Sequence, residues 1–157
     1  SDNKALNFTD KNNNNYQIII LFLKISNISQ LEEVLNVNVN KYKFVFLQSV
    51  TKKVFQQITS TYDNVEVFFI DELLEDIPSK VFIPKHTLLN DSDKTELLNN
   101  FKSSELAKIY EYDIMSRYYN AKPDDIFRIE RFNLNSCTSI YYRVIIKSPV
   151  DIIFNKY

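Results

Sequence analysis

The chain has 157 residues, of which 45% are hydrophobic and 25% charged, and its formal net charge is -1 at pH 7. Such a composition is typical of one globular domain or two small ones. The near-neutral charge argues against nucleic-acid binding without help from other chains, because that binding draws on a strong basic excess. A single cysteine, Cys137, excludes an internal disulfide and the usual cysteine-based zinc sites.

Glycine is missing from the chain, while asparagine, lysine, isoleucine and tyrosine are used heavily. We interpret this bias as the codon usage of an AT-rich genome. It has a structural consequence, because left-handed backbone positions must then be filled by asparagine or aspartate, whose short polar side chains tolerate that region best. The longest apolar run, residues 18–23, is too short to cross a bilayer, so no membrane association is expected.

The first half of the chain alternates between strand and helix patterns. Residues 1–15 are polar and include an asparagine run, which predicts a flexible lead-in. The apolar stretch 17–25 predicts a strand that is buried on both faces. The patterns that follow predict a helix at 29–37, a strand at 41–48, a helix at 51–62 capped by Thr51, a strand at 65–70 and a short acidic helix at 71–77. Such β-α-β units close right-handed and predict a small parallel sheet with helices packed on it, within residues 1–80.

The second half, residues 81–157, begins with an extended segment at 83–89 and continues with an amphipathic helix. Three adjacent residues are candidates for the cap of this helix: Asp91, Ser92 and Asp93. Asp113 is expected to cap a further helical turn, which ends at Asn120 in the left-handed region.

An antiparallel strand pair is predicted at 126–132 and 139–146, on either side of a short loop. The tail at 151–157 contains apolar residues that predict an additional strand. The fold class that follows is α+β/α/β, with a small β-α-β domain at 1–80 and a compact mixed domain with an antiparallel sheet at 81–157.

Residues for catalysis or metal binding are scarce. One histidine and one cysteine nearly exclude catalytic triads and clustered metal ligands, and phosphate-binding loops of the usual form need glycine. We therefore expect no catalytic residues, no metal, no cofactor and no small-molecule substrate. Acidic residues do gather near Lys80: Asp71, Glu72, Glu75 and Asp76. Their spacing does not fit a restriction-type nuclease and suits a solvated helix face, so a degenerate nuclease-like protein is kept only as an alternative.

Several polar and aromatic residues favour a binding role. All four arginines fall between positions 117 and 143, and arginine is preferred for planar, bidentate contacts at interfaces, although a plain surface location also explains them. His86 is either a general base or pH switch, or a hydrogen-bonded core or interface residue. The tyrosine pairs at 118–119 and 141–142 can stack bases, but such residues more often belong to a core or a partner contact.

An ordered series of residues between 81 and 146 resembles the C-terminal assembly module of the fifth subunit of eukaryotic RNA polymerases, a small shared subunit with an archaeal counterpart. In chain order the series is Ile83-Pro84-Lys85-His86, Glu96-Leu97-Leu98, Leu106, Ile109, Asp113, Arg117, Tyr118, Lys122, Tyr142 and Arg143. The resemblance implies that residues 81–157 dock on the largest polymerase subunit. The contact residues that it implies, together with Arg131, are Pro84, Lys85, His86, Arg117, Tyr118, Lys122, Tyr142 and Arg143.

The chain departs from this family at its glycines. Asn120, Asp124 and Cys137 stand where the family has glycine, and Ile114 stands where it has proline. Asn120 and Asp124 suit turns, whereas Cys137 is expected to require a different loop geometry at the hairpin.

Residues 16–80 are similar to the later half of the eukaryotic subunit's N-terminal jaw domain, in which a Thr-capped helix faces downstream DNA. The resemblance places Thr51 at that cap and Lys52 where the family has proline. A helix N-terminus with Lys52 and Lys53 suits a DNA phosphate, although two solvated lysines explain the pattern equally well.

The function expected from the resemblance is that of a non-catalytic subunit of DNA-directed RNA polymerase, in a large DNA virus or another divergent lineage. Its partners would be the largest subunit, other polymerase subunits and the backbone of downstream duplex DNA. Its location would be the nucleus, or a cytoplasmic viral factory or virion. A free-standing interaction or regulatory protein derived from the subunit is the other alternative.

Overall fold

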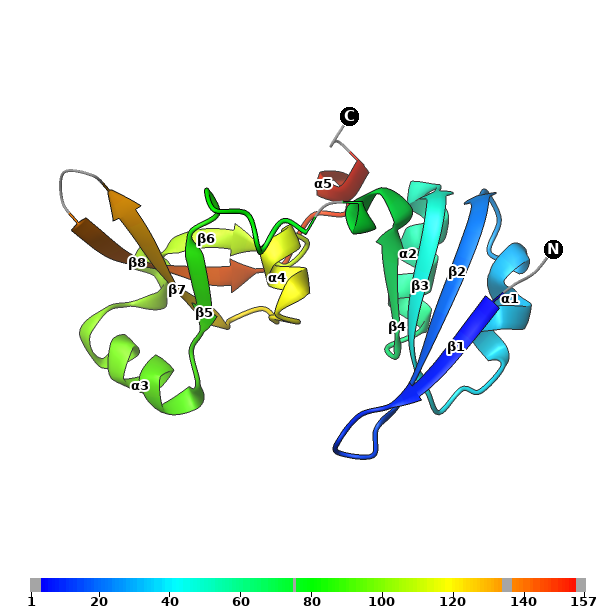
Figure 1. The fold of residues 1–157 in the computed structure, drawn as a ribbon, viewed down its shortest axis with the longest axis horizontal. Helices are drawn as coiled ribbons and strands as arrows, with labels where there is room; N and C mark the ends of the chain where they lie inside the picture. Colours follow the sequence, from blue (N-terminus) through cyan, green and yellow to red (C-terminus); the bar gives the residue numbers. More distant parts are fainter. Residues whose placement is uncertain (1–3, 75, 134–136, 155–157) are drawn as a thin grey trace. The chain divides into compact units, whose positions relative to one another are not determined.

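The structure is a computed structural model that describes residues 4–74, 76–133 and 137–154. The chain divides into two compact units, residues 1–75 and residues 76–157 (Figure 1). Each unit is built on its own four-stranded sheet. No helix within the described ranges is both long and apolar enough to span a membrane.

The sheet of the first unit has the strand order β1-β2-β3-β4. β1 is antiparallel to β2, whereas β2, β3 and β4 run parallel. Helices α1 and α2 connect the parallel strands, so the predicted β-α-β units are confirmed. The bounds of these elements are β1 (Lys4–Thr9), β2 (Asn15–Ile25), α1 (Ser29–Asn36), β3 (Tyr42–Val50), α2 (Lys52–Thr61), β4 (Val65–Phe69) and the 3-10 helix η1 (Ile70–Leu73).

The prediction of a flexible lead-in over residues 1–15 is wrong for its described part, because β1 pairs with β2 along its whole length. Leu6 and Phe8 alternate with polar residues and lie opposite apolar partners in β2, which gives this strand one apolar face. The turn that follows is held by Asp10, whose carboxylate accepts the backbone N–H groups of Asn12 and Asn14 at 2.8 Å each. The pKa of Asp10 is held below its usual value by hydrogen bonds to its carboxylate, and the largest contribution comes from the side chain of Asn14.

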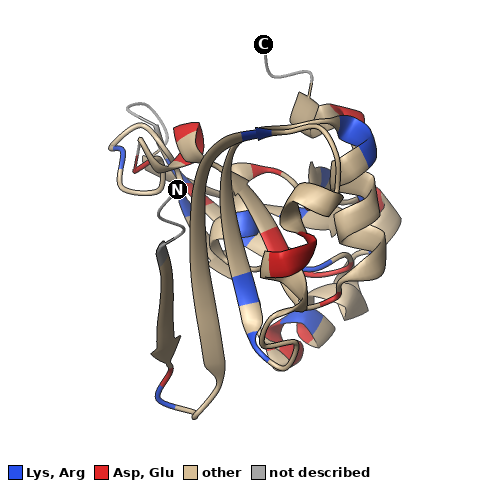
Figure 2. Cartoon of the chain, turned by 90° about the vertical axis from the view of Figure 1, so that its right-hand side faces the viewer, with Lys and Arg blue, Asp and Glu red and all other residues tan. Residues whose placement is uncertain are grey.

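The prediction that the apolar stretch 17–25 is buried on both faces is also wrong. Buried and partly exposed residues alternate along β2 and β3, and α1 and α2 lie on the same side of the sheet (Figure 2). The strand order explains this, because right-handed crossovers that continue in one direction across a sheet place their helices on one face. The opposite face carries packed aromatic rings, with centroid separations of 5.1 Å between Phe8 and Tyr16 and 5.2 Å between Phe46 and Phe68.

Lys43 is a fully buried cation on the helix-covered face of β3. Its ammonium donates to the backbone carbonyl of Leu35, and it reaches that of Val34 at 3.4 Å. Carbonyls in the last turn of a helix have no partners within the helix, so Lys43 satisfies the C-terminal end of α1 and joins it to the sheet. Burial lowers the pKa of this ammonium from its ordinary value of 10.5.

The sheet of the second unit has the strand order β5-β7-β8-β6, with β5 and β8 antiparallel to β7, and β6 parallel to β8. The bounds are β5 (Lys85–Leu88), α3 (Asp91–Asn100), η2 (Ser103–Glu105), β6 (Ala107–Tyr110), α4 (Ile114–Tyr118), β7 (Ile126–Asn133), β8 (Cys137–Ile146) and α5 (Asp151–Phe154). The predicted antiparallel pair is therefore confirmed as β7 and β8.

Three details of the second unit differ from the sequence predictions. The cap of α3 is Asn90, whose side chain accepts from Asp93 N at 2.9 Å, so none of the three candidates caps this helix. β6 was not predicted, because its four residues are too few to show a strand pattern. The described part of the tail is the short helix α5, not a strand, and it follows Pro149, which has no N–H to donate to a sheet.

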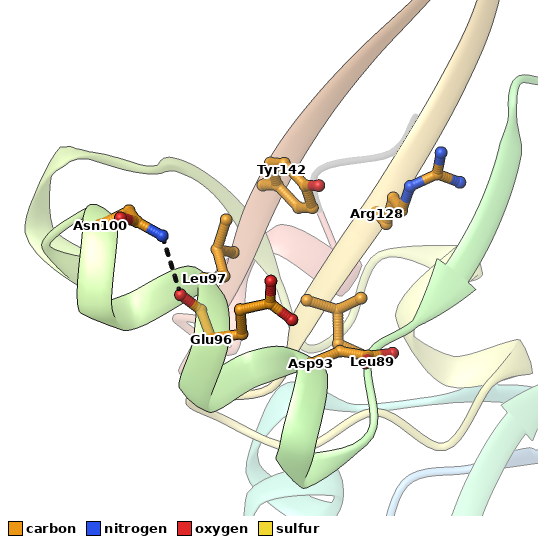
Figure 3. A pocket seen from close by; sticks show the side chains of 7 residues that line it. All are labelled: Leu89, Asp93, Glu96, Leu97, Asn100, Arg128 and Tyr142. Carbon is orange, nitrogen blue, oxygen red and sulfur yellow. Dashed lines mark hydrogen bonds between the residues drawn. The ribbon is translucent and has the colours of Figure 1, made fainter.

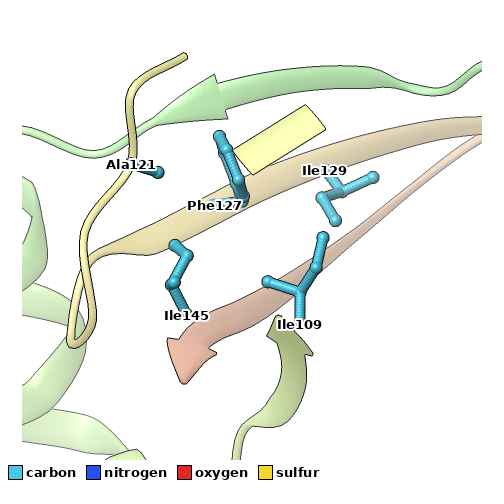
Figure 4. Close-up of a cluster of buried hydrophobic side chains, with 5 residues drawn as sticks. All are labelled: Ile109, Ala121, Phe127, Ile129 and Ile145. Atoms are coloured by element: carbon cyan, nitrogen blue, oxygen red, sulfur yellow. The ribbon is translucent and has the colours of Figure 1, made fainter. Parts of the chain in front are cut away.

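Two buried clusters lie on opposite faces of this sheet. One contains Ile109, Ala121, Phe127, Ile129 and Ile145 (Figure 4). The other contains Leu97, Ile126 and Val144, so α3 covers the second face. Successive residues of β7 and β8 alternate between the clusters, as the two-residue period of a strand requires.

The positions that need a left-handed backbone follow the prediction made from the missing glycines. Four of the five residues with positive φ in the described chain are asparagine or aspartate: Asn13, Asn38, Asn120 and Asp124. The fifth is Cys137 with φ 60°. Cys137 therefore takes a left-handed backbone without being glycine, and the expectation of a different loop geometry stays a prediction, because residues 134–136 lie outside the described residues.

Lys43 gives the first unit a testable pH dependence. The pKa of Lys43 is lower in the folded protein than in the unfolded one. Below the folded pKa the cost of burying the charged ammonium destabilises the fold in full, and this cost is relieved as the pH rises toward 10.5. Lys43→Met keeps the aliphatic stem and removes the titration. We expect the free energy of unfolding of the wild type to rise relative to that of Lys43→Met between neutral pH and pH 10.5, measured by urea denaturation of both proteins. A constant difference over this range would contradict the lowered pKa.

Candidate partner-docking surface

The two faces of the second sheet divide the predicted contact residues. We name the face that carries Phe127 the α4 face, because Tyr119 at the end of α4 packs edgewise on the Phe127 ring at 5.5 Å. We name the opposite face, where Leu97 packs, the α3 face. The register of β5, β7 and β8 places His86, Arg131 and Arg143 on the α4 face.

The helix α4 is positioned by local hydrogen bonds that the sequence predicted. The Asp113 carboxylate accepts from Met115 N at 2.9 Å, so Asp113 is the N-cap. Asn120 follows the helix with φ 50°, and the N–H of Ala121 returns to Ser116 O at 2.8 Å. These contacts close the helical turn, which presents Tyr118 with 64% of its surface exposed and Arg117 partly buried beside it.

Arg143 is the most distinctive side chain of the α4 face. Its guanidinium carbon lies 5.9 Å from the centroid of the Tyr141 ring, which is cation–π distance. Its Nε atom is buried, and no hydrogen-bond acceptor contacts it within the described ranges. A buried N–H without an acceptor costs free energy, so this group favours an oxygen brought by another molecule.

His86 is held by the fold of the strand that carries it. Its Nδ1 atom lies 2.7 Å from the carbonyl oxygen of Pro84, and its ring packs edgewise on Phe127 at 5.5 Å. Its neighbours therefore include a backbone oxygen and an aromatic ring. This arrangement fits a packed surface histidine better than a general base.

Lys85 and Tyr142 lie on the α3 face, away from His86 and Arg143. Lys85 is exposed and its ammonium is 3.7 Å from the Glu130 carboxylate. Arg128 on the same face donates to Glu130, and this hydrogen bond is the main cause that holds the pKa of Glu130 below its usual value. The structure thus does not gather all the predicted contact residues into one surface.

Two other predicted contacts are less informative. Arg131 is exposed near the end of β7, on the α4 face. Lys122 is exposed in the turn that follows α4, where its backbone N–H donates to the Asp125 carboxylate at 2.8 Å. Tyr141 was considered in the sequence only as one of a tyrosine pair and was left out of the expected contact residues, although its spacing of two from Arg143 on one strand is a signal that both share a face.

In the first unit, the three predicted DNA-contact residues lie together at the start of α2. Thr51 occupies the N-cap position with extended backbone, but its side chain makes no capping hydrogen bond. Lys52 and Lys53 are the first two residues of the helix, and all three are exposed. Helix N–H groups and two ammonium groups therefore coincide at this point.

The acidic residues considered for a nuclease do not form a metal site in the described chain. Asp71 is exposed, Glu72 accepts the backbone N–H of Phe69 at 3.0 Å, and Asp76 accepts the hydroxyl of Ser79 at 2.6 Å. Glu75 lies outside the described residues. Among residues that the structure describes, no group of three or more histidine, cysteine, aspartate or glutamate side chains could hold a metal ion.

Comparison with known proteins assigns the second unit to a class. Residues 75–145 match the family described as RNA polymerase Rpb5, C-terminal domain. The chain is 33% identical over 73 residues to DNA-directed RNA polymerase subunit Rpo5 of Methanocaldococcus jannaschii, which covers 45% of this chain and 94% of the archaeal protein. It is 29% identical over 135 residues to DNA-directed RNA polymerase subunit 5 of Acanthamoeba polyphaga mimivirus, covering 83% of this chain and 65% of the viral protein.

A plant relative, subunit 5B of DNA-directed RNA polymerases IV and V from Arabidopsis thaliana, is 26% identical over 110 residues, or 69% of this chain and 50% of the plant protein. The chain therefore spans about half to two thirds of these longer relatives and nearly all of the archaeal one. The chain belongs to the Rpb5/Rpo5 family of DNA-directed RNA polymerase subunits, as its sequence motifs predicted.

The cap of α4 can be tested by its effect on stability. Asp113→Ala removes the acceptor of Met115 N and should lower the free energy of unfolding by about 1 kcal/mol. Thermal unfolding followed by circular dichroism should show this as a fall in Tm of roughly 4 to 8 °C. Asp91→Ala is the matched control, because Asp91 is an exposed first-turn residue of α3 and does not cap it. An equal fall in Tm in the two variants would show that the capping hydrogen bond of Asp113 does not stabilise the fold beyond the effect of losing a surface carboxylate.

Proposed function

We propose that this protein is a non-catalytic subunit of a multisubunit DNA-directed RNA polymerase. Membership of the Rpb5/Rpo5 family carries the proposal. The single histidine and the single cysteine of the sequence agree with it, since the chemistry of nucleotide addition would then belong to other subunits. The expected location is the nucleus, or a viral factory or virion if the source is a virus related to mimivirus.

The second unit acts as an assembly domain that docks on the largest polymerase subunit through the α4 face. The buried Nε of Arg143, which has no acceptor among the residues that the structure describes, supports this choice of face, because a partner's carboxylate or backbone oxygen would complete its hydrogen bonding. The exposed Tyr118 ring, with Arg117 next to it, extends the same surface, and Tyr side chains and Arg side chains are enriched at the energetic centres of interfaces.

The first unit acts as a small jaw-like domain beside downstream duplex DNA and touches phosphates without reading bases. The start of α2, with Thr51, Lys52 and Lys53, supports this part of the proposal. The net charge of -1 means that the contact is local, and that other polymerase chains hold the DNA.

Docking predicts a difference between neighbouring residues on opposite faces. Arg143→Ala and Arg117→Ala should each weaken binding of the chain to the largest subunit about fivefold to thirtyfold, and so reduce its co-purification, because truncating an interface arginine costs about 1 to 2 kcal/mol. Lys85→Ala is the control, since its exposed ammonium lies on the α3 face.

The measurement is the stoichiometry of tagged variants in the isolated polymerase, with circular dichroism to confirm folding. If the Lys85→Ala variant were depleted from the isolated polymerase as strongly as the Arg143→Ala variant, docking through the α4 face would be contradicted. A wild-type chain that purifies without any large polymerase subunit would contradict the subunit function itself and favour a free-standing regulatory protein.

The DNA contact predicts a salt-dependent effect. Lys52→Gln with Lys53→Gln removes two cations, so retention of downstream duplex by the assembled polymerase should fall at low salt, and the slope of log affinity against log salt should become shallower by up to about 1.8. Lys11→Gln with Lys24→Gln, in exposed parts of the same unit, is the matched control. Equal retention by both double variants at low salt would remove α2 from the DNA path.

A further inference from the structure

A groove on the α3 face of the second unit is not used by the docking proposed above. It has a volume of about 390 Å³ and lies between α3 and the strands β7 and β8 (Figure 3). The residues that line it are Leu89, Asp93, Glu96, Leu97, Asn100, Arg128 and Tyr142. Tyr142 is one of the residues that the sequence singled out for partner contact, and its position here separates it from Arg143 on the other face.

The floor of the groove is apolar and its helical wall is acidic. Leu97 is buried, and Leu89 and Tyr142 are partly buried beside it. From α3, Glu96 extends its carboxylate toward the space in front of the Tyr142 ring (Figure 3). Within the described ranges, no hydrogen-bond donor or cation contacts that carboxylate. The carboxylate of Asp93, on the same helix, accepts from the Asn90 side chain at 3.0 Å, and no cation of the described chain pairs with it.

Arg128, the one cation among the described residues that line the groove, does not neutralise this acidic wall. Arg128 donates to Glu130 on its own strand, and in Figure 3 its guanidinium turns away from Glu96. The ammonium of Lys85 also forms an ion pair with the Glu130 carboxylate, at 3.7 Å. Both cations therefore contact Glu130, not Asp93 or Glu96, and the two carboxylates of α3 are left facing the groove.

We propose that this groove receives an arginine or lysine side chain from a partner polypeptide. The aliphatic stem would pack on Leu89 and Leu97, the charged end would pair with Glu96, and the Tyr142 ring would contact its cationic group. The volume is large enough for one long side chain, and the groove is open to solvent, as a side chain carried by a partner chain requires. The inference rests on the chain working among other polypeptides, but not on which of them occupies the α4 face.

The first test uses the full-length protein and a blocked amino acid as the probe. N-acetyl-arginine amide should shift the NMR signals of Glu96, Leu97 and Tyr142, with Kd on the order of 1 mM or weaker for so small a ligand. N-acetyl-citrulline amide has nearly the same shape without the charge, and it should produce no comparable shifts. Glu96→Gln should weaken arginine-amide binding about fivefold, whereas Glu33→Gln, an exposed glutamate of α1, should not.

The outcomes separate the possible occupants. Equal binding of the citrulline and arginine amides, or shifts confined to other residues, would overturn a cation site. Spermidine binding with Glu96 dependence, while both the arginine amide and N-acetyl-lysine amide fail to bind, would identify a free polyamine as the ligand and overturn the polypeptide proposal.

The second test places a photo-crosslinking residue at Asn100, on the rim of the groove, in the complex isolated from cells. The expected adduct is a peptide of another chain that carries arginine or lysine at the crosslink, and Glu96→Gln should reduce its yield. The same probe at Asn36, at the end of α1, is the control. A complex that forms normally but gives no Glu96-dependent adduct would refute this inference and leave the docking proposal intact, whereas loss of complex formation with Arg143→Ala tests docking alone.

Discussion

The antiparallel register between β7 and β8 determines which side chains of the second unit share a surface. It pairs Arg128 with Tyr142 and Phe127 with Arg143. Tyr142 and Arg143, although adjacent in sequence, therefore lie on opposite faces of the sheet. A shift of one residue in β7 would exchange the faces of that strand and turn Arg128 toward the cluster that holds Phe127 and Ile129. The buried clusters on both sides of the sheet therefore fix the positions of the polar groups as firmly as they fix the core. The surface chemistry of this unit depends on that pairing.

Sequence alone predicted the features that depend on local backbone chemistry. The Asp113 cap, the left-handed Asn120 and the alternation of strands and helices in the first unit need only nearby residues, and all three are present. The elements that were missed depend on distant partners. β1 is stabilised by pairing with β2, and the four-residue β6 by pairing with β8. The alternation in β1 is confined to Leu6 and Phe8, and β6 is too short to show a period.

The burial of the first sheet on a single face has the same origin. The apolar run of β2 suggested burial of both its faces, but the strand order places both helical crossovers on one side, and that order is a property of the whole chain. The residues left on the other face are largely aromatic and pack against one another, as the stacked rings of Tyr16 and Phe44 show. Apolar content in a strand thus predicts burial against something, while the topology decides whether that is a helix or the neighbouring side chains.

The sequence predicted the candidate site as a set of residues without saying which of them lie together. The structure divides this set between the two faces of the second sheet. Arg128 and Arg143 are both arginines on adjacent strands, but they differ in how their hydrogen bonds are completed. Arg128 is engaged by Glu130 two residues away, whereas Arg143 keeps a buried Nε without an acceptor in the described chain. An arginine whose hydrogen bonds are complete within the fold adds little binding free energy, because it must break those bonds before it can form new ones to a partner. An unsatisfied one gains by binding, which is the physical reason to place docking on the α4 face and to assign the acidic groove a different occupant.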